Sequence, residues 1–555
     1  MAAALHGTEI LPDRTVFHAW APRVGGLAVR VLGRDHAMLG DGEGAWSVEI
    51  AGAGHGDDYQ LILPDGRALT DPASRSQPAG VHGPSRLFDP GRHAWRHPGF
   101  RGLPLEALVL YELHVGTFTP EGTLDAAAAR LPDLAELGVT CVELMPVQPF
   151  PGERNWGYDG VAPWAVHEAY GGPEALQRLV DRAHGLGLAV ALDVVYNHLG
   201  PEGNHLAPLA PYFTSRHKTP WGDGLDWDGP AAPAVRTWAI GAATQWVRDF
   251  RVDVLRLDAT HAIEDASPRH VVAELREAVA EEGRRAGRLV HVIAEDDRND
   301  RAVLEPPPAG WGCSAVWADD LHHALHALVT GERGRYLADF GAPADVARAL
   351  AEGFVYQGQR SRYRGRPHGT SPRGLAPSRF VTCAQNHDQV GNRPHGERLA
   401  TLVPWEALAP ISALVLLGSG TPLLFMGEEY GEQRPFLYFT SHGDPALARA
   451  VTEGRRAEHL SAAGGPPPDP QSPETFLRSK LTHRRDGRHG AHRARLRTLL
   501  EVRARHLEEI AAGWPEVRAD GTAFALRRRG LEVLANLSAT PAGGLGPWAL
   551  EVREG

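Results

Sequence analysis

The stretch LAVALDVVYNH (188–198) is an apolar run that ends in two polar side chains, Asn197 and His198. Strands that are covered on both faces read as continuous apolar runs of this kind, which is typical of parallel sheets. The same pattern recurs in ALVLYELHVG (107–116), VTCVELMPV (139–147), VDVLRLDATH (252–261), LVHVIAEDD (289–297), AVWADDLHH (315–323), RFVTCAQNHD (379–388) and TPLLFMGEE (421–429). Helical patterns separate these runs, as in residues 173–185, where apolar side chains recur at i, i+3, i+4 and i+7. The alternation predicts the α/β class and a (β/α)8 TIM barrel.

Two β-rich regions flank the predicted barrel. Residues 15–72 contain short strand-like runs separated by Gly and Asp turns, at the spacing typical of a sandwich. We therefore assign residues 1–100 to an N-terminal β-sandwich, residues 101–490 to the barrel, and residues 491–555 to a helix and a small C-terminal β-domain. Segments near 199–232 and 355–378 are too long for tight loops, and we expect them to wall a cleft.

The charge balance of the chain bears on its partners. Of 555 residues, 43% are apolar and 23% are charged, and the formal net charge is −11. This acidic balance argues against nucleic acid or an anionic membrane as partner, because both favour a basic face. The apolar run 411–426 is interrupted by Gly418, Gly420 and Pro422, so no segment is expected to span a membrane.

Cysteine usage bears on the compartment. Cys141, Cys313 and Cys383 lie far apart in apolar runs. Their odd number and wide spacing favour buried free thiols in a reducing compartment over a disulfide framework. The first residues, MAAALHGTEILPDRT, bring in acidic side chains before any long apolar stretch, which is not typical of a secretory signal. The expected location is the cytoplasm.

Polar side chains follow four of the predicted strands. They are Asn197 and His198, Asp258 and His261, Glu295, and His387 and Asp388. Active sites of TIM barrels lie where strands end and loops begin. A single aspartate at a strand end is more often a helix cap or a salt-bridge partner, and most of the 28 histidines must be structural. Four polar strand ends on one rim nevertheless favour an active site. The histidines lack HxxxH or paired-cysteine spacing, so no metal site is expected.

The carboxylates of this set fit glycoside cleavage. That reaction needs one carboxyl to protonate the leaving oxygen and a second to attack the anomeric carbon or activate water. Arg256 precedes Asp258 by two positions, so both side chains share one face of the strand and the guanidinium favours an ionised carboxylate. Glu295 ends the apolar run LVHVIAE, which should raise its pKa and keep a transferable proton. We expect one charged and one neutral carboxyl.

Four strings resemble, in order and spacing, the four signature regions of the alpha-amylase superfamily of retaining α-glucosidases and transglycosylases: DVVYNH (193–198), LRLDATH (255–261), IAEDD (293–297) and NHDQVGNR (386–393). Within that superfamily the chain is most similar to the malto-oligosyltrehalose trehalohydrolases, over residues 15–460. This likeness is carried by YELHVGTFTPEGT (111–123), RNWGYDGV (154–161), HEAYGGPE (167–174), DVVYNHLGPEGN (193–204), DDLHHALHALVTGE (319–332), QNHDQVGNR (385–393) and PFLYFTSHGDPALARAVTEGRRAE (435–458).

The resemblance implies roles for individual residues. Asp258 would be the nucleophile, Glu295 the general acid/base and Asp388 the third carboxylate, which binds sugar hydroxyls and stabilises the transition state. Arg256 would pair with the nucleophile and Asp193 would brace it. Further matched positions, which would lie around the substrate, are Tyr158, Asp159, His198, His261, Asp320, His322, His323, His387, Gln389 and Asn392. Among these, His198 and His387 would hydrogen-bond hydroxyls of the attacked glucose, and Tyr158 would stack on its ring.

The implied reaction is hydrolysis of the α-1,4 bond that joins a malto-oligosaccharide to its terminal trehalose unit. Retention through a glycosyl-enzyme predicts that the carboxyls of Asp258 and Glu295 lie about 5–5.5 Å apart. No organic cofactor is expected, and the implied pathway partner is a synthase that makes the trehalose-capped substrate. The alternative is a glycogen branching enzyme, which transfers the glucan to another chain. The N-terminal domain resembles a glycogen-binding module.

Overall fold

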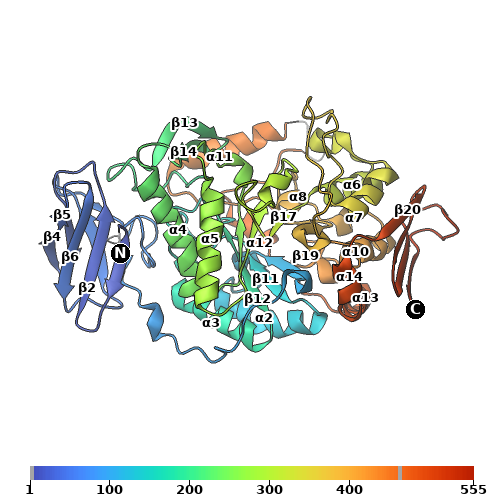
Figure 1. Ribbon diagram of the computed structural model, residues 1–555, viewed down its shortest axis with the longest axis horizontal. Helices are drawn as coiled ribbons and strands as arrows, with labels where there is room; N and C mark the ends of the chain where they lie inside the picture. The colour runs from blue at the N-terminus through green and yellow to red at the C-terminus, as the bar shows by residue number, and fades with distance from the viewer. Residues whose placement is uncertain (1–4, 461–464) are drawn as a thin grey trace.

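The computed structural model describes residues 5–460 and 465–555. Three parts of the chain lie in a row in Figure 1. The N-terminal sheets are at the left, the barrel with its helices is in the centre, and the C-terminal sheet is at the right. The N-terminal sheet domain, the barrel and the C-terminal sheet domain predicted from the sequence are all present.

Eight parallel strands close the barrel. They are β10 (Leu110–Leu113), β11 (Cys141–Leu144), β12 (Ala189–Val194), β15 (Val254–Leu257), β16 (His291–Glu295), β17 (Ala315–Trp317), β18 (Phe380–Cys383) and β19 (Thr421–Phe425). The last strand pairs with the first, since Leu423 of β19 lies opposite Leu110 of β10. Each apolar run identified in the sequence contains one of these strands, so the predicted barrel is confirmed.

Helices surround the barrel. After β10, β11, β12 and β15 come α2 (Leu124–Leu137), α3 (Gly172–Gly185), α4 (Ala232–Arg248) and α5 (Val271–Arg285). Only the short helix η5 (Arg301–Val303) is described between β16 and β17, so this unit departs from strict strand–helix alternation. The later helices of the ring are α6 (Asp320–Thr330), α7 (Pro343–Glu352), α10 (Leu408–Leu416) and α13 (Gly487–Arg505).

The position of α13 differs from the sequence-based grouping, which joined residues 491–512 to the C-terminal sheet. This helix packs against α10 on one side and α2 on the other. It therefore fills the place of the helix that follows the eighth strand. Its buried side chains include Leu496, Leu499 and Leu500, which continue the apolar surface of the barrel. The boundary between the barrel and the C-terminal sheet thus falls more naturally after this helix than before it.

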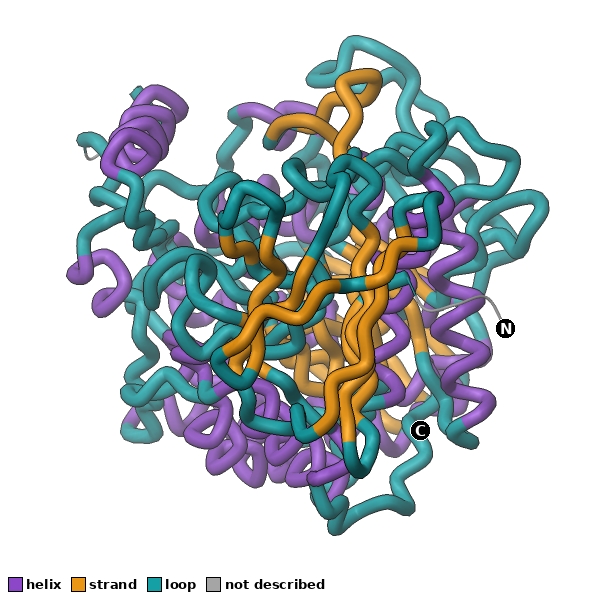
Figure 2. Tube along the Cα trace, turned by 90° about the vertical axis from the view of Figure 1, so that its left-hand side faces the viewer, coloured by secondary structure: helices purple, strands orange, loops and turns teal. Residues whose placement is uncertain are grey.

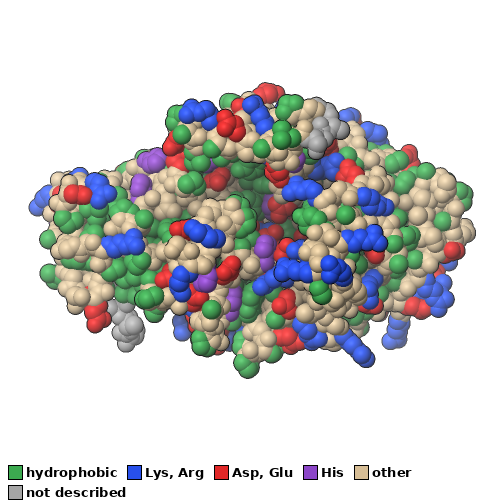
Figure 3. Space-filling model, turned by 90° about the horizontal axis from the view of Figure 1, so that it is seen from above, with side chains coloured by type: hydrophobic (Ala, Val, Ile, Leu, Met, Phe, Trp, Pro, Cys, Tyr) green, Lys and Arg blue, Asp and Glu red, His purple; other side chains and the backbone are tan. Residues whose placement is uncertain are grey.

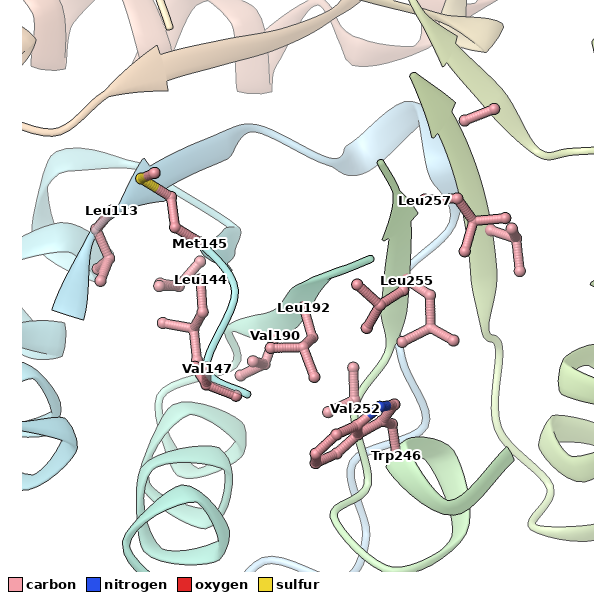
Figure 4. Close-up of a cluster of buried hydrophobic side chains, with 14 of the residues drawn as sticks. Leu113, Leu144, Met145, Val147, Val190, Leu192, Trp246, Val252, Leu255 and Leu257 are labelled. Carbon is pink, nitrogen blue, oxygen red and sulfur yellow. The ribbon is translucent and has the colours of Figure 1, made fainter. Parts of the chain in front are cut away.

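The barrel interior contains two layers of side chains, because residues two apart on a strand share a face. The lower layer is apolar and buried: Leu110, Cys141, Ala191, Val254 and Ile293. Two positions further along, the same strands carry the polar side chains Glu112, Glu143, Asp193, Arg256 and Glu295. The opposite face of each strand packs against helices. Figure 4 shows this outer layer, with Val190, Leu192 and Leu255 lying near Trp246 of α4.

The remaining elements are smaller. The N-terminal region contains two sheets. The first is formed by β1 (Gly7–Ile10), β2 (Arg14–Trp20), β6 (Ala45–Ala51) and β5 (Leu39–Gly40). The second is formed by β4 (Arg34–Ala37), β3 (Ala28–Val31), β7 (Asp58–Ile62), β8 (Ala68–Leu69) and β9 (Ser85–Arg86). Figure 2 views the molecule from this side, with these strands in front. The rings of Phe88, which follows β9, and Phe250, which follows α4, stack with their centroids 5.8 Å apart. This contact joins the end of the N-terminal region to the barrel.

The segment 199–232 includes a hairpin, β13 (Phe213–Thr219) and β14 (Gly222–Leu225). The C-terminal sheet is formed by β20 (Glu516–Asp520), β21 (Ala523–Arg528), β22 (Leu531–Asn536) and β23 (Leu550–Glu554). The remaining α-helices are the 14-residue α11 (Pro445–Glu458) and five short ones: α1 (Val115–Phe118), α8 (His387–Gly391), α9 (Leu399–Leu402), α12 (Pro473–Arg478) and α14 (Leu507–Ala512). The three cysteines are free and buried, as predicted. Within the described residues, no helix has the length and apolar character that crossing a membrane requires.

Candidate active site

Arg256, on β15, lies at the centre of a cluster of carboxylates and is fully buried. Its Nη1 lies 2.8 Å from Asp258 Oδ1 and 2.9 Å from Asp193 Oδ2. Its Nη2 lies 2.9 Å from Glu295 Oε2. The guanidinium carbon of Arg256 lies 4.3 Å from the centroid of the Trp317 ring, in a cation–π contact. The buried guanidinium of Arg256 therefore contacts three carboxylates, which come from β12, from the end of β15 and from β16.

Asp258 follows the last residue of β15 and is oriented from two sides. Arg256 donates to its Oδ1, and the Asn197 side chain donates to its Oδ2 at 2.6 Å. Asn197 also donates to the backbone carbonyl of Asp258. The carboxylate is 11% exposed, so one edge remains open to a ligand. Asp193, which shares Arg256 with it, is almost completely enclosed.

Glu295 closes β16 on the other side of the guanidinium. Its Oε2 accepts the backbone N–H of Ala259 at 2.7 Å. Ala259 has φ of +40°, a conformation that L-residues rarely adopt, and this turn aims its N–H at the carboxyl. Burial raises the pKa of Glu295 well above its usual range; Arg256 opposes this, whereas the negative charges of Asp258 and Asp388 add to it. The carboxyl is therefore suited to hold a proton at neutral pH.

Asp388 lies in α8, beyond the end of β18, and is the most exposed of the three predicted catalytic carboxylates, at 34%. Its Oδ1 is 3.5 Å from His387 Nε2 and accepts from Asn392 at 3.1 Å. The same His387 nitrogen lies 2.8 Å from the Tyr158 hydroxyl, which donates to Asp193 Oδ2 at 2.6 Å. A continuous chain of polar contacts thus joins Asp388 to Arg256.

His198 contacts Asn197 through Nδ1 and the Tyr158 carbonyl through Nε2 at 3.0 Å. The indole of Trp221, from the turn between β13 and β14, stacks on its ring at 4.6 Å. Burial lowers the pKa of His198 below that of a free imidazole, and the charge of Asp258 opposes this effect. Asp159 lies next in the chain to Tyr158 and accepts from Asn155 at 2.6 Å.

Other sequence-predicted residues have different surroundings. Asp320 Oδ2 accepts from the backbone of Val355 at 2.6 Å and of Tyr356 at 3.1 Å, and from the Asn299 side chain at 2.8 Å. It therefore fastens the start of the segment 355–378 to α6. His322 donates its Nδ1–H to the Ala384 carbonyl at 2.6 Å and is buried.

His323 lines a small cavity of about 40 Å³ near the ends of β16 and β17, and the walls of the cavity include Asp297, Tyr336 and residues of the segment 355–378. His261 and Gln389 lie next to residues of its wall. His261 lies 3.8 Å from Asp297, and Gln389 accepts from the Tyr336 hydroxyl at 3.0 Å. Seen from above, the surface is hollowed near its centre, with acidic and histidine side chains in the hollow (Figure 3).

Sequence reasoning missed three residues of this region. Glu112 and Glu143 are buried carboxyl groups inside runs that the sequence analysis describes as apolar, and the Trp317 ring packs against the Arg256 guanidinium. A signal was available, because a glutamate interrupts each of YELHV and CVELM at a position that shares the inner face of the strand. A single glutamate in a buried strand is unusual enough to mark a polar site.

Comparison with known proteins gives consistent results. The catalytic-domain model of the alpha-amylase family matches residues 76–218. Malto-oligosyltrehalose trehalohydrolase of Rhizobium sp. (strain M-11) is 44% identical, with 95% of this chain and 91% of the relative covered. The enzyme of the same name from Saccharolobus solfataricus is 44% identical, with 86% and 83% covered.

Solved structures agree on the fold. The crystal structure of a putative alpha amylase from Salmonella typhimurium has a TM-score of 0.92 and 42% identity, with 99% of each chain covered. A pullulanase from Paenibacillus barengoltzii, at 20% identity and a TM-score of 0.71, shares the fold alone. The carboxylate cluster, the eight-stranded barrel and relatives aligned over nearly the whole chain lead to one conclusion: the chain belongs to the malto-oligosyltrehalose trehalohydrolase family of alpha-amylase-type glycoside hydrolases.

Proposed function

We propose that the protein hydrolyses the α-1,4-glucosidic bond next to the terminal trehalose unit of malto-oligosyltrehalose and releases trehalose and a malto-oligosaccharide. The observation that supports glycoside chemistry most strongly is the contact of one guanidinium with both Asp258 and Glu295. The choice of substrate is supported by relatives that are 40–48% identical and are malto-oligosyltrehalose trehalohydrolases.

In this proposal Asp258 attacks the anomeric carbon while Glu295 protonates the glycosidic oxygen that leaves with trehalose. A covalent ester forms between the sugar and Asp258. Glu295, now ionised, takes a proton from water, which attacks the same carbon and releases the sugar with its α configuration retained. Charge moves from Asp258 to Glu295 in the first step, and Arg256 contacts both carboxylates, so the cation compensates the pair before and after the transfer.

Asp388, His387, His198 and Tyr158 are assigned to the glucose that is attacked. The exposed edge of the Asp388 carboxylate supports this role, because it leaves oxygen atoms open to sugar hydroxyls. The further positions Asp159, His261, Gln389 and Asn392 are likewise assigned to the substrate, as is His323, which lines the cavity near β16 and β17. Asp320 and His322 are better described as residues that hold the walls of the site, because their polar atoms contact protein groups.

A branching enzyme would use the same ester and pass the glucan to a sugar hydroxyl instead of water. A branching enzyme of Bacillus caldolyticus is 29% identical but aligns with only 44% of this chain, which favours the hydrolase. The two proposals differ in products. Incubation with maltosyl trehalose is expected to yield trehalose and maltose by chromatography. Products with new α-1,6 branches, and no free trehalose, would favour the branching enzyme instead.

The proposed setting is the cytoplasm, and buried, unpaired cysteines support it. The substrate carries trehalose at one end of a maltodextrin. A synthase that converts the reducing end of the maltodextrin into this unit is therefore the proposed pathway partner.

A further inference from the structure

Glu112, on β10, is a buried carboxylate that contacts His387 of the site. Its side chain is 1% exposed. Oε1 lies 2.5 Å from His387 Nδ1, and Oε2 accepts the backbone N–H of His387 at 2.9 Å. Both oxygens therefore face donors of the same residue, so the glutamate fixes the imidazole and its backbone together.

Hydrogen-bond accounting sets the protonation of this imidazole. A carboxylate only accepts, so Nδ1 must carry a proton toward Glu112. The single proton of the Tyr158 hydroxyl is directed at Asp193 Oδ2 at 2.6 Å, and Arg256 donates to the same aspartate. The hydroxyl therefore accepts on its other side, where His387 Nε2 lies at 2.8 Å. Both ring nitrogens carry protons, which makes His387 an imidazolium.

The charges around His387 agree with this assignment. The titratable groups that face it or interact with it electrostatically are Glu112, His114, Glu143, Tyr158, Asp193, Arg256 and Asp388. Burial lowers the pKa of His387, but Asp388 and Glu112 outweigh burial and raise it to about 10, against a smaller opposing effect of Arg256. The ring centroids of Trp156 and Tyr158 lie 5.7 Å and 5.2 Å from that of His387. These two side chains enclose the imidazole and leave water little access.

Glu143 provides an internal contrast. It lies opposite Glu112 in the register of β10 and β11 and is equally buried. Burial and the charge of Glu112 raise its pKa well above the usual range. No hydrogen bond joins Glu143 to His387 within the described residues. Of these two adjacent glutamates, Glu112 is thus the one that contacts the imidazole.

We propose that Glu112 is a positioning residue for the reaction, which keeps His387 doubly protonated, with its Nε2–H donated to the Tyr158 hydroxyl and its positive charge held beside Asp388. This inference rests on the proposed function. A glutamine could not replace the glutamate, because its amide has one acceptor and one donor group where His387 presents two donors. The consequence is a fixed positive charge beside Asp388, at 3.5 Å, on the rim of the site.

The test compares wild type with Glu112→Gln and with Glu143→Gln as matched control. Histidine labelled with ¹³C at Cε1 reports ring protonation by NMR, and His387→Gln assigns the His387 signal. In wild type and Glu143→Gln the signal should stay in its protonated position through pH 8. In Glu112→Gln the midpoint should fall by about 1–3 pH units, because an opposite charge in direct contact has been removed. The kcat on maltosyl trehalose should fall about 10- to 100-fold.

A wild-type His387 that titrates near pH 6.5 would overturn the proposal, whether or not the variants fold. So would a Glu112→Gln protein with an unchanged His387 titration. Loss of kcat with an unchanged titration would reduce Glu112 to a structural residue, which also contradicts the proposal. The NMR measurement needs no substrate, so failure of wild type to release trehalose would refute the proposed function and leave this inference to be decided by the titration.

Discussion

The two layers inside the barrel are formed by the same strands, yet they differ in almost every physical respect. Leu110, Cys141, Val254 and Ile293 of the lower layer are apolar and fully buried. The layer two residues above has carboxylates around the single cation Arg256. Burial of apolar side chains stabilises the fold, whereas buried charges contribute little net stability even when they are paired. The lower layer thus stabilises the barrel, and this stability allows the upper layer to contain buried charged groups.

The upper layer has more carboxylates than cations, and this imbalance has a chemical consequence. Asp193, Asp258 and Glu295 share one guanidinium, so mutual repulsion keeps one of them from ionising readily. Burial and these charges raise the pKa of Glu295 well above its usual range, and burial raises that of Asp193 to about 6. Repulsion that would weaken a structural core here produces a proton donor next to a charged nucleophile.

The largest effect is expected from Asp258→Asn, which removes the proposed nucleophile from the upper layer. The amide keeps the shape of the side chain and can still accept from Arg256, while Asp193 and Glu295 continue to neutralise the guanidinium. We expect kcat on maltosyl trehalose to fall about 10⁴-fold or more, with the melting temperature nearly unchanged. A variant that keeps one tenth of wild-type turnover would show that Asp258 does not attack the sugar.

A smaller loss is expected from Glu295→Gln, which removes the proton donor. General acid catalysis contributes about 10²–10⁴-fold, so kcat should fall by that amount on maltosyl trehalose but much less with α-maltosyl fluoride, whose leaving group needs no proton. The protonated form of Glu295 exists below its pKa, so wild-type kcat/KM should decline as pH rises through that raised value. The decline should be absent in the variant, and its persistence would assign the acid to another group.

The smallest effect on turnover is expected from Leu110→Ala, in the lower layer. Leu110 lies two residues before Glu112 on β10 and shares its face, so the pair compares the two layers at one place. Truncation of a fully buried leucine should lower the free energy of unfolding by about 2–5 kcal/mol, measured by chemical denaturation. At a temperature where the variant is folded, its kcat should equal that of wild type. A large loss of kcat would mean that the layers are not separable.

The sequence predicts the lower layer and the catalytic carboxylates better than it predicts the connections between them. Continuous apolar runs identify every barrel strand, and the ends of those runs identify Asp258, Glu295 and Asp388. The sequence does not reveal the contact of Glu112 with His387, because the two residues lie 275 positions apart and no local pattern indicates such a pair.

The helix ring shows the same limit. The sequence assigns a helix to the region after residue 490, but which surface a helix covers depends on long-range packing, and α13 packs against α10 and α2. Asp320 likewise occurs in a string that resembles substrate-binding stretches, although its carboxylate accepts from Val355 and Tyr356 of a later segment. The sequence shows residue types and their order, whereas the contact partners of each side chain depend on how the folded barrel brings distant segments together.

The covalent ester on Asp258 is the central claim, and trapping it is the most direct test. With α-maltosyl fluoride, the Glu295→Gln protein should form the ester, because fluoride leaves without a proton, and should hydrolyse it slowly, because no base activates water. Mass spectrometry of the intact protein and of its proteolytic peptides should then find one maltosyl group on the peptide that contains Asp258. An adduct on a different residue, or rapid release of β-maltose with no adduct, would contradict the account.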